Sequence, residues 1–169
     1  MNLKWIGAVA VFVGCGGFGF RMAAIHRRQE KELRDLITAL DVLSNELRYR
    51  LSPLPELCCQ VAASLPGKVG KAFGLLHIEL ERQIASDASY CVNAAVHRSE
   101  LSPVVGNLFL DLGRTLGRFD LDGQLQGIEA VRKDASAALD MLVKDKDARL
   151  RSYQTLGLCA GAALAILLM

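Results

Sequence analysis

Nothing in this sequence divides it into separate parts. The 4 prolines and 15 glycines do not gather into a linker, and there is no internal repeat or low-complexity tract. A chain of 169 residues is long enough for one domain and its attachments. No stretch alternates apolar and polar residues for long, as a half-buried strand would. The sequence therefore predicts an all-α fold.

An excess of charge of one sign is missing as well. The chain has 20 basic and 18 acidic residues, and its net charge of +2 is too small to indicate a protein that binds nucleic acid. Hydrophobic residues, in contrast, make up 51% of the chain. This fraction is high for a soluble protein, and two segments lying in a membrane would account for it.

Motifs for metal or cofactor binding are also absent. The chain has no Cys-x-x-Cys pair and no glycine-rich phosphate loop, which argues against a zinc or nucleotide site. The 5 cysteines and 3 histidines are irregularly spaced, which argues against a disulfide framework. We expect the cysteines to be buried as small hydrophobic residues in a reducing compartment. Cys58 and Cys59 are adjacent, so they point to different sides of their helix.

The sequence offers no convincing catalytic group. Asp120 and Asp122 stand at an expected helix start, where capping and the helix dipole account for both. Glu79 and Glu81 face different sides of a helix and have no histidine or cysteine at a useful spacing. We therefore expect no enzyme activity, catalytic residue, metal, cofactor or small-molecule substrate. An uncharacterised membrane enzyme is the alternative, and a point mutation that abolishes an activity without disturbing assembly would support it.

Long apolar segments are present at both ends of the chain. The segment from Trp5 to Phe20 carries no charge and covers roughly 24 Å of a hydrocarbon core about 30 Å thick. The segment from Leu156 to Met169 is shorter and covers roughly 21 Å. The sequence predicts transmembrane helices at residues 3–25 and 153–169.

The domain between these spans, residues 26–152, is predicted to face the cytoplasm. Basic residues flank both spans on their inner sides, and such residues stay on the cytoplasmic face of a membrane. Gly157 and Gly161 lie one turn apart, and a small face of this kind would let the second span pack closely against the first.

Cys15 provides an alternative mode of attachment. Phe12-Val13-Gly14-Cys15 is a poor match to a bacterial lipobox, in which the cysteine is lipidated after cleavage. A lipid-anchored chain would carry its helical domain outside the cell. The residues that follow Cys15 stay apolar, whereas a lipoprotein would have a polar tether there.

Between the spans, the apolar residues follow a helical period. One seam predicts a helix that continues the first span until Ser52-Pro53 ends it, and the other predicts a helix that begins near Leu121, with Asp120 as N-cap, and continues into the second span. Two such helices should pack as an antiparallel pair. The seam positions are Leu33, Leu36, Leu40, Leu43 and Leu47, then Leu121, Leu125, Ile128, Ala135, Leu139 and Leu142. Shorter helices are predicted at residues 54–64, 68–85, 88–97 and 103–117, the last two capped by Asp87 and Ser102.

Several short segments, in their order and spacing, carry a resemblance that covers essentially the whole chain. They are Gly19-Phe20 before a basic helix, Leu43 with Glu46-Leu47-Arg48-Tyr49 and Ser52-Pro53-Leu54, Leu112-Gly113 and Leu116-Gly117 with Asp120 and Gln124, and Tyr153, Leu156-Gly157, Gly161 and Ile166-Leu167-Leu168. With these segments the chain resembles the stage III sporulation protein AB family of endospore-forming bacteria.

The resemblance implies a membrane protein of the sporulation channel complex. It would lie in the mother-cell membrane around the forespore, with its helical domain in the cytoplasm. That domain would be similar to the cytoplasmic domains of platform proteins in type II secretion and type IV pilus systems. Its partners would be membrane lipid, other subunits of the channel complex and a secretion-type ATPase, which it would dock during assembly.

Polar residues within the family segments are the candidate partner contacts: Glu46, Arg48, Tyr49, Arg114, Asp120 and Gln124. Simpler structural roles compete with this interpretation. Asp120 fits a helix cap, and the pairs Glu46–Arg50 and Asp111–Arg114 fit ion pairs on a helix surface, each worth a few tenths of a kcal/mol.

Overall fold

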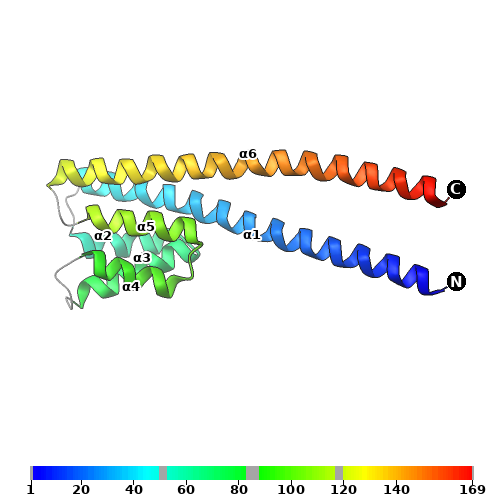
Figure 1. The fold of residues 1–169 in the computed structure, drawn as a ribbon. Coiled ribbons are helices and arrows are strands. Elements are labelled where there is room, and N and C mark those ends of the chain that lie inside the picture. Colours follow the sequence, from blue (N-terminus) through cyan, green and yellow to red (C-terminus); the bar gives the residue numbers. More distant parts are fainter. Residues whose placement is uncertain (1, 50–52, 83–87, 117–119, 169) are drawn as a thin grey trace.

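The fold is all-α, as the sequence predicts. The computed structural model describes the backbone of residues 2–49, 53–82, 88–116 and 120–168, and the side chains of residues 25–49, 53–82, 88–116 and 120–145. Over this backbone the chain forms six helices and no strand (Figure 1). They are α1 (Asn2–Tyr49), α2 (Leu54–Ser64), α3 (Lys68–Glu81), α4 (Ala88–Ser99), α5 (Pro103–Thr115) and α6 (Leu121–Leu168).

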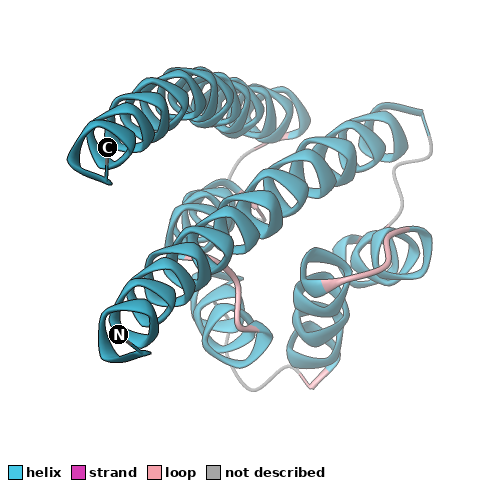
Figure 2. Ribbon diagram, turned by 90° about the vertical axis from the view of Figure 1, so that its right-hand side faces the viewer, coloured by secondary structure: helices cyan, strands magenta, loops and turns pink. Residues whose placement is uncertain are grey.

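The two long helices form the predicted antiparallel hairpin. Each has 48 residues and runs without interruption, and both chain termini lie at the same end of the molecule (Figure 1). The shorter helices α2 to α5 lie beside the half of the hairpin that is far from the termini. Figure 2 shows α1 in the middle, with α6 on one side of it and most of the shorter helices on the other.

The core consists of the predicted leucine seam and the apolar faces of the short helices. The five seam leucines of α1 are buried, as are Ile128 and Ala135 of α6. The rings of Phe73 and Phe109 meet edge to face with their centroids 4.8 Å apart, a favoured arrangement for aromatic pairs. Seam residue Leu121 departs from the prediction: it is 36% exposed, because it stands in the first turn of α6 at the end of the bundle.

Three of the predicted boundaries shift by a few residues. The helix α3 ends at Glu81, earlier than predicted, and α4 continues to Ser99. Glu100, which directly follows α4, has a φ of 56°, a value uncommon for a residue other than glycine. Helix α5 ends at Thr115, with Leu116 as its C-cap in extended conformation. The predicted cap Asp87 lies outside the described residues.

Glycines allow two of the helix contacts to be close. A Cβ on Gly113 of α5 would lie 2.7 Å from Val92 Cγ2 of α4, and a Cβ on Gly127 of α6 would lie 2.6 Å from Thr115 of α5. Both distances are shorter than side-chain carbon contacts allow. These glycines therefore set how closely α5 approaches its neighbours on either side.

The expected membrane spans lie almost entirely outside the residues whose side chains are described. Within the described residues, no helix is long and apolar enough to cross a membrane. Apart from Ile25, the segments 3–25 and 153–169 lie where the structure describes no side chains, and so do Cys15, Gly157 and Gly161.

Candidate functional site

All six candidate contact residues lie at one end of the bundle. Glu46, Arg48 and Tyr49 belong to the end of α1, Arg114 to the last turn of α5, and Asp120 and Gln124 to the start of α6. Because α6 is antiparallel to α1, its first turn lies beside the last turns of α1. We call this end, opposite the chain termini in Figure 1, the distal end.

Four of the six candidates are exposed to solvent: Arg48, Tyr49, Arg114 and Asp120. Tyr49 is 79% exposed, the highest value among the large hydrophobic side chains described, and its neighbour Arg48 is also exposed. Arg114 is exposed on α5. Tyrosine and arginine are the residue types most enriched at protein interfaces, because they combine a large contact area with polar groups.

The other candidates have structural roles or are less accessible. The carboxylate of Asp120 accepts a hydrogen bond from the Gly123 backbone N–H at 3.1 Å, which confirms the predicted N-cap of α6. Its carbonyl also accepts the Gln124 N–H at 2.9 Å. Glu46 and Gln124 are half-buried, and Arg50, the proposed partner of Glu46, lies outside the described residues.

The Arg114 side chain is held by its own helix. Its Nη1 donates to Asp111 Oδ1 at 2.7 Å, which confirms the predicted surface pair. Both side chains are well exposed, so the pair contributes little to stability. It fixes the direction of the guanidinium group instead and leaves its other N–H donors available to a partner.

Sequence reasoning missed a buried carboxylate at the end of the bundle opposite the distal end. Glu32 of α1 is only 7% exposed. Its Oε2 accepts the backbone N–H of Ser102 at 2.8 Å, and its Oε1 lies 3.5 Å from Lys68 Nζ. Lys68 Nζ also donates to the Glu100 carbonyl. One side chain of α1 thereby holds the start of α3 and the start of α5.

The predicted role of Ser102 is only partly correct. Ser102 occupies the N-cap position of α5, but its hydroxyl makes no capping hydrogen bond, and that buried oxygen has no hydrogen-bond partner. The hydrogen bond that fixes this residue is made by its backbone N–H to Glu32. The signal available in the sequence was an acidic residue one turn before the buried Leu36.

A second connection joins the two long helices. Asp41 of α1 accepts a hydrogen bond from Arg132 Nε of α6 at 2.6 Å, and Arg132 Nη1 also reaches Glu129 at 3.2 Å. The hydrogen bond and charge of Asp41, with the charge of Glu129, raise the pKa of the Arg132 guanidinium. Since the pair spans 91 positions of the sequence, it fixes the register of α6 on α1.

The interpretation of Glu81 needs correction. No histidine was expected at a useful spacing from Glu81, but His77 lies one turn earlier, and its Nε2 is 3.7 Å from Glu81 Oε2. The other ring nitrogen, Nδ1, is 3.0 Å from the Pro55 carbonyl, which connects α3 to the start of α2. Within the part of the chain described, no three His, Cys, Asp or Glu side chains form a group that could hold a metal ion.

Two of the three cysteines with described side chains follow the prediction of burial, and Cys15 and Cys159 lie outside those residues. Cys58 and Cys91 are buried, whereas Cys59 is exposed. This difference confirms that the adjacent Cys58 and Cys59 point to different sides of α2. Burial, with a smaller contribution from the neighbouring Cys59, raises the pKa of the Cys58 thiol to about 12. Cys58 is therefore a packing residue, and Cys59 is the accessible thiol.

Comparison with known proteins gives consistent matches. The family described as stage III sporulation protein AB matches residues 4–169. The stage III sporulation protein AB of Bacillus subtilis (strain 168) is 27% identical over 176 residues, which cover 99% of each chain. A solved structure of a stage III sporulation protein AB (SpoIIIAB) has a TM-score of 0.64 and 22% identity, and it covers 72% of this chain and 98% of that one. This last similarity concerns the fold.

Proposed function

Because this chain belongs to the stage III sporulation protein AB family, we propose that it is a membrane-anchored assembly component of a sporulation channel complex. Family membership supports the role in sporulation. In the proposal, the bundle lies on the cytoplasmic side of the mother-cell membrane around the forespore, and its distal end docks a secretion-type ATPase. The observation that carries the docking is the gathering of exposed Arg48, Tyr49 and Arg114 at that end.

The position of the distal end suits a docking surface. From Ile25 to Tyr49, α1 is continuous and rises roughly 36 Å. If the apolar segments at the termini lie in a membrane, the distal end stands this far from it, where a soluble protein can reach it. Both long helices lead to the distal end without a break.

The residues at this end differ in what they can offer to a partner. Arg114 already uses one of its donors on Asp111, and Asp120 uses one oxygen on the start of α6. Among the described residues, no side chain forms an ion pair or hydrogen bond of this kind with Arg48 or Tyr49, and both stand in the last turn of α1. We therefore expect these two residues to contribute most to docking, against a partner surface that carries carboxylates.

Co-purification from sporulating cells tests the docking. The full-length chain is solubilised in detergent, and the ATPase retained with it is identified by mass spectrometry. We expect Tyr49→Ala and Arg48→Glu each to reduce retention by about tenfold or more, as substitution of a central interface residue does. The control is Met141→Ala, since Met141 is 69% exposed and lies twenty residues along α6 from Leu121, a rise of roughly 30 Å from the distal end. Equal losses from the Tyr49 and Met141 variants would contradict docking at the distal end.

Labelling of Cys59 tests the cytoplasmic location. Cys59 is the exposed thiol of the described bundle, so a membrane-impermeant maleimide should label it in broken cells and leave it unlabelled in intact cells. Cys59→Ser provides the control for labelling elsewhere in the chain. Labelling of Cys59 in intact cells would place the bundle outside and favour the lipid-anchored alternative through Cys15.

A further inference from the structure

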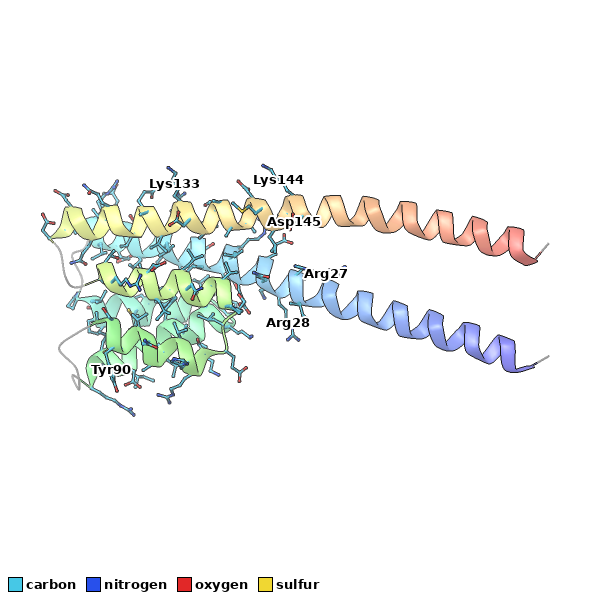
Figure 3. The ribbon with its side chains drawn as sticks, in the orientation of Figure 1. Arg27, Arg28, Tyr90, Lys133, Lys144 and Asp145 are labelled. Atoms are coloured by element: carbon cyan, nitrogen blue, oxygen red, sulfur yellow. The ribbon has the colours of Figure 1, made fainter. Side chains whose placement is uncertain are left out.

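A group of cations surrounds the hairpin where it leaves the bundle. Arg27, Arg28 and Lys31 of α1 and Lys144 of α6 are all exposed, and we call these four residues the basic collar. Figure 3 shows Arg27, Arg28 and Lys144 at the place where α1 and α6 continue toward the termini without α2–α5 beside them.

The two halves of the collar lie at the same level of the hairpin. Asp41 of α1 pairs with Arg132 of α6, and the two helices are antiparallel. A residue twelve positions after Arg132 is therefore opposite a residue about twelve positions before Asp41. This places Lys144 level with Gln29, next to Arg28, so the collar is contributed by both helices.

The carboxylates on this part of α1 are used within the protein. Glu30 accepts a hydrogen bond from Arg34 at 3.0 Å, and the buried Glu32 is held by Lys68 and by the Ser102 N–H. Among the residues with described side chains, no carboxylate forms an ion pair with a collar cation. Three exposed acids lie near this end: Asp145 beside Lys144, Asp140 one turn earlier on α6, and Glu100 after α4. The four collar cations outnumber them.

The exposure of α1 at this level leaves its cations free to point away from the bundle. Ile25, Arg27 and Arg28 are all exposed, although they lie on different sides of the helix. Arg27 follows the end of the apolar segment, Phe20, by seven residues, a rise of roughly 10 Å. This distance is about one Debye length at physiological ionic strength, and the arginine side chain shortens it further.

We propose that the basic collar binds the anionic phospholipid headgroups of the membrane that holds the ends of α1 and α6. The inference rests on the membrane anchoring in the proposed function and adds to it the lipid class that the chain recognises. Anionic lipid on the cytoplasmic leaflet attracts basic residues next to a span, and each such residue raises binding by about fivefold. Arginine also forms two parallel hydrogen bonds to one phosphate.

The lipid retained by the full-length protein tests this inference. The chain is inserted into nanodiscs of phosphatidylcholine with a minor fraction of phosphatidylglycerol, and the lipids that stay bound after release are counted by native mass spectrometry. We expect phosphatidylglycerol to be enriched over its fraction in the disc. The double variant Arg27→Gln/Arg28→Gln should lower that enrichment by about tenfold or more, and added salt should lower it for the unsubstituted chain.

The double variant Lys71→Gln/Lys133→Gln is the matched control, because it removes the same charge from exposed positions outside the collar. It should keep the enrichment of the unsubstituted chain. Equal losses in the two double variants would overturn the inference, and so would insertion of the unsubstituted chain without enrichment, which leaves the proposed function standing. If the collar variant loses a bound acidic protein but keeps its enrichment in phosphatidylglycerol, the inference is also overturned and the proposed function stands. A chain that does not insert at all overturns both the inference and the membrane part of the proposed function.

Discussion

Replacing Glu32 with alanine should separate the short helices from α1 more effectively than any surface substitution. Glu32 is the one carboxylate of the described residues that is buried. It supports two chain segments that are distant in sequence, since Ser102 lies 70 positions away. Without it, the Ser102 N–H loses its acceptor in a place that water reaches poorly, and Lys68 loses its ionic partner.

The expected loss of stability follows from these two contacts. A buried donor left without an acceptor costs about 1–3 kcal/mol. The Lys68 contact adds little, because the lysine side chain is 39% exposed and its Nζ is 3.5 Å from the carboxylate, so it falls within the ~0–1 kcal/mol typical of surface pairs. We therefore expect Glu32→Ala to lower the free energy of unfolding by about 2–3 kcal/mol. Glu32→Gln, which keeps an oxygen acceptor of the same reach, should cost about 1 kcal/mol.

Denaturant unfolding of the full-length chain in detergent, followed by helical circular dichroism, measures these differences. Lys68→Met serves as the third variant, and it should cost less than about 1 kcal/mol. If Glu32→Ala unfolds at the same denaturant concentration as the unsubstituted chain, the buried hydrogen bond does not hold α5 in place. If Glu32→Gln is as destabilising as Glu32→Ala, the charge rather than the acceptor is the stabilising feature.

Two further predictions concern packing and thiol reactivity. Gly113→Ala should destabilise the fold by about 1–2 kcal/mol, because its Cβ would lie 2.7 Å from Val92. Gly74→Ala, whose Cβ would meet Ala62 at 3.6 Å, should be neutral or stabilising by up to ~1 kcal/mol. Thermal unfolding compares the two variants, and equal destabilisation would contradict the close approach at Gly113. At pH 8 an alkylating reagent should modify Cys59 and leave Cys58 unmodified until the chain is unfolded, because the thiolate is the reactive form and the folded chain holds the Cys58 proton to about pH 12 rather than 9.0. For the same reason, the contribution of the protonated Cys58 thiol to the free energy of unfolding is complete below pH 9 and declines as the pH rises toward 12. Mass mapping of modified peptides checks the first statement, and unfolding at several pH values checks the second. Fast modification of Cys58 in the folded chain would contradict both.

The periodic parts of the fold were predictable from sequence because their cause is local. The 3-4 spacing of Leu33 to Leu47 identifies the buried face of α1 whatever it packs against, and all five leucines are buried. The pair Asp111–Arg114 and the cap at Asp120 were also predictable, since each involves residues three positions apart.

Contacts between distant segments could not be found by the same reasoning. Glu32 looks like an ordinary surface residue of a charged helix until Ser102 and Lys68 are brought to it. The pairing of Asp41 with Arg132 depends on the register of two helices, which a leucine seam fixes only to within a turn. At the candidate site, the family segments supplied the residues, but their difference in exposure came from the structure. Arg48 and Tyr49 are open, whereas Glu46 is half-buried.

The arrangement of contacts also determines how the distal end is coupled to the rest of the chain. The helix α1 touches α2, α3, α5 and α6, while α6 packs only on α1 and α5 among the described contacts. A partner that binds Arg48 and Tyr49 therefore holds the helix on which the short helices are assembled, and that helix continues to the N-terminal segment with no loop between them. Since no proline interrupts either long helix and Asp41–Arg132 fixes their register, a displacement at the distal end has to move both terminal segments together. If the chain is docked and anchored as proposed, the two contacts lie at opposite ends of the same two helices, and a substitution that loosens their register should weaken the coupling while leaving each end able to bind separately.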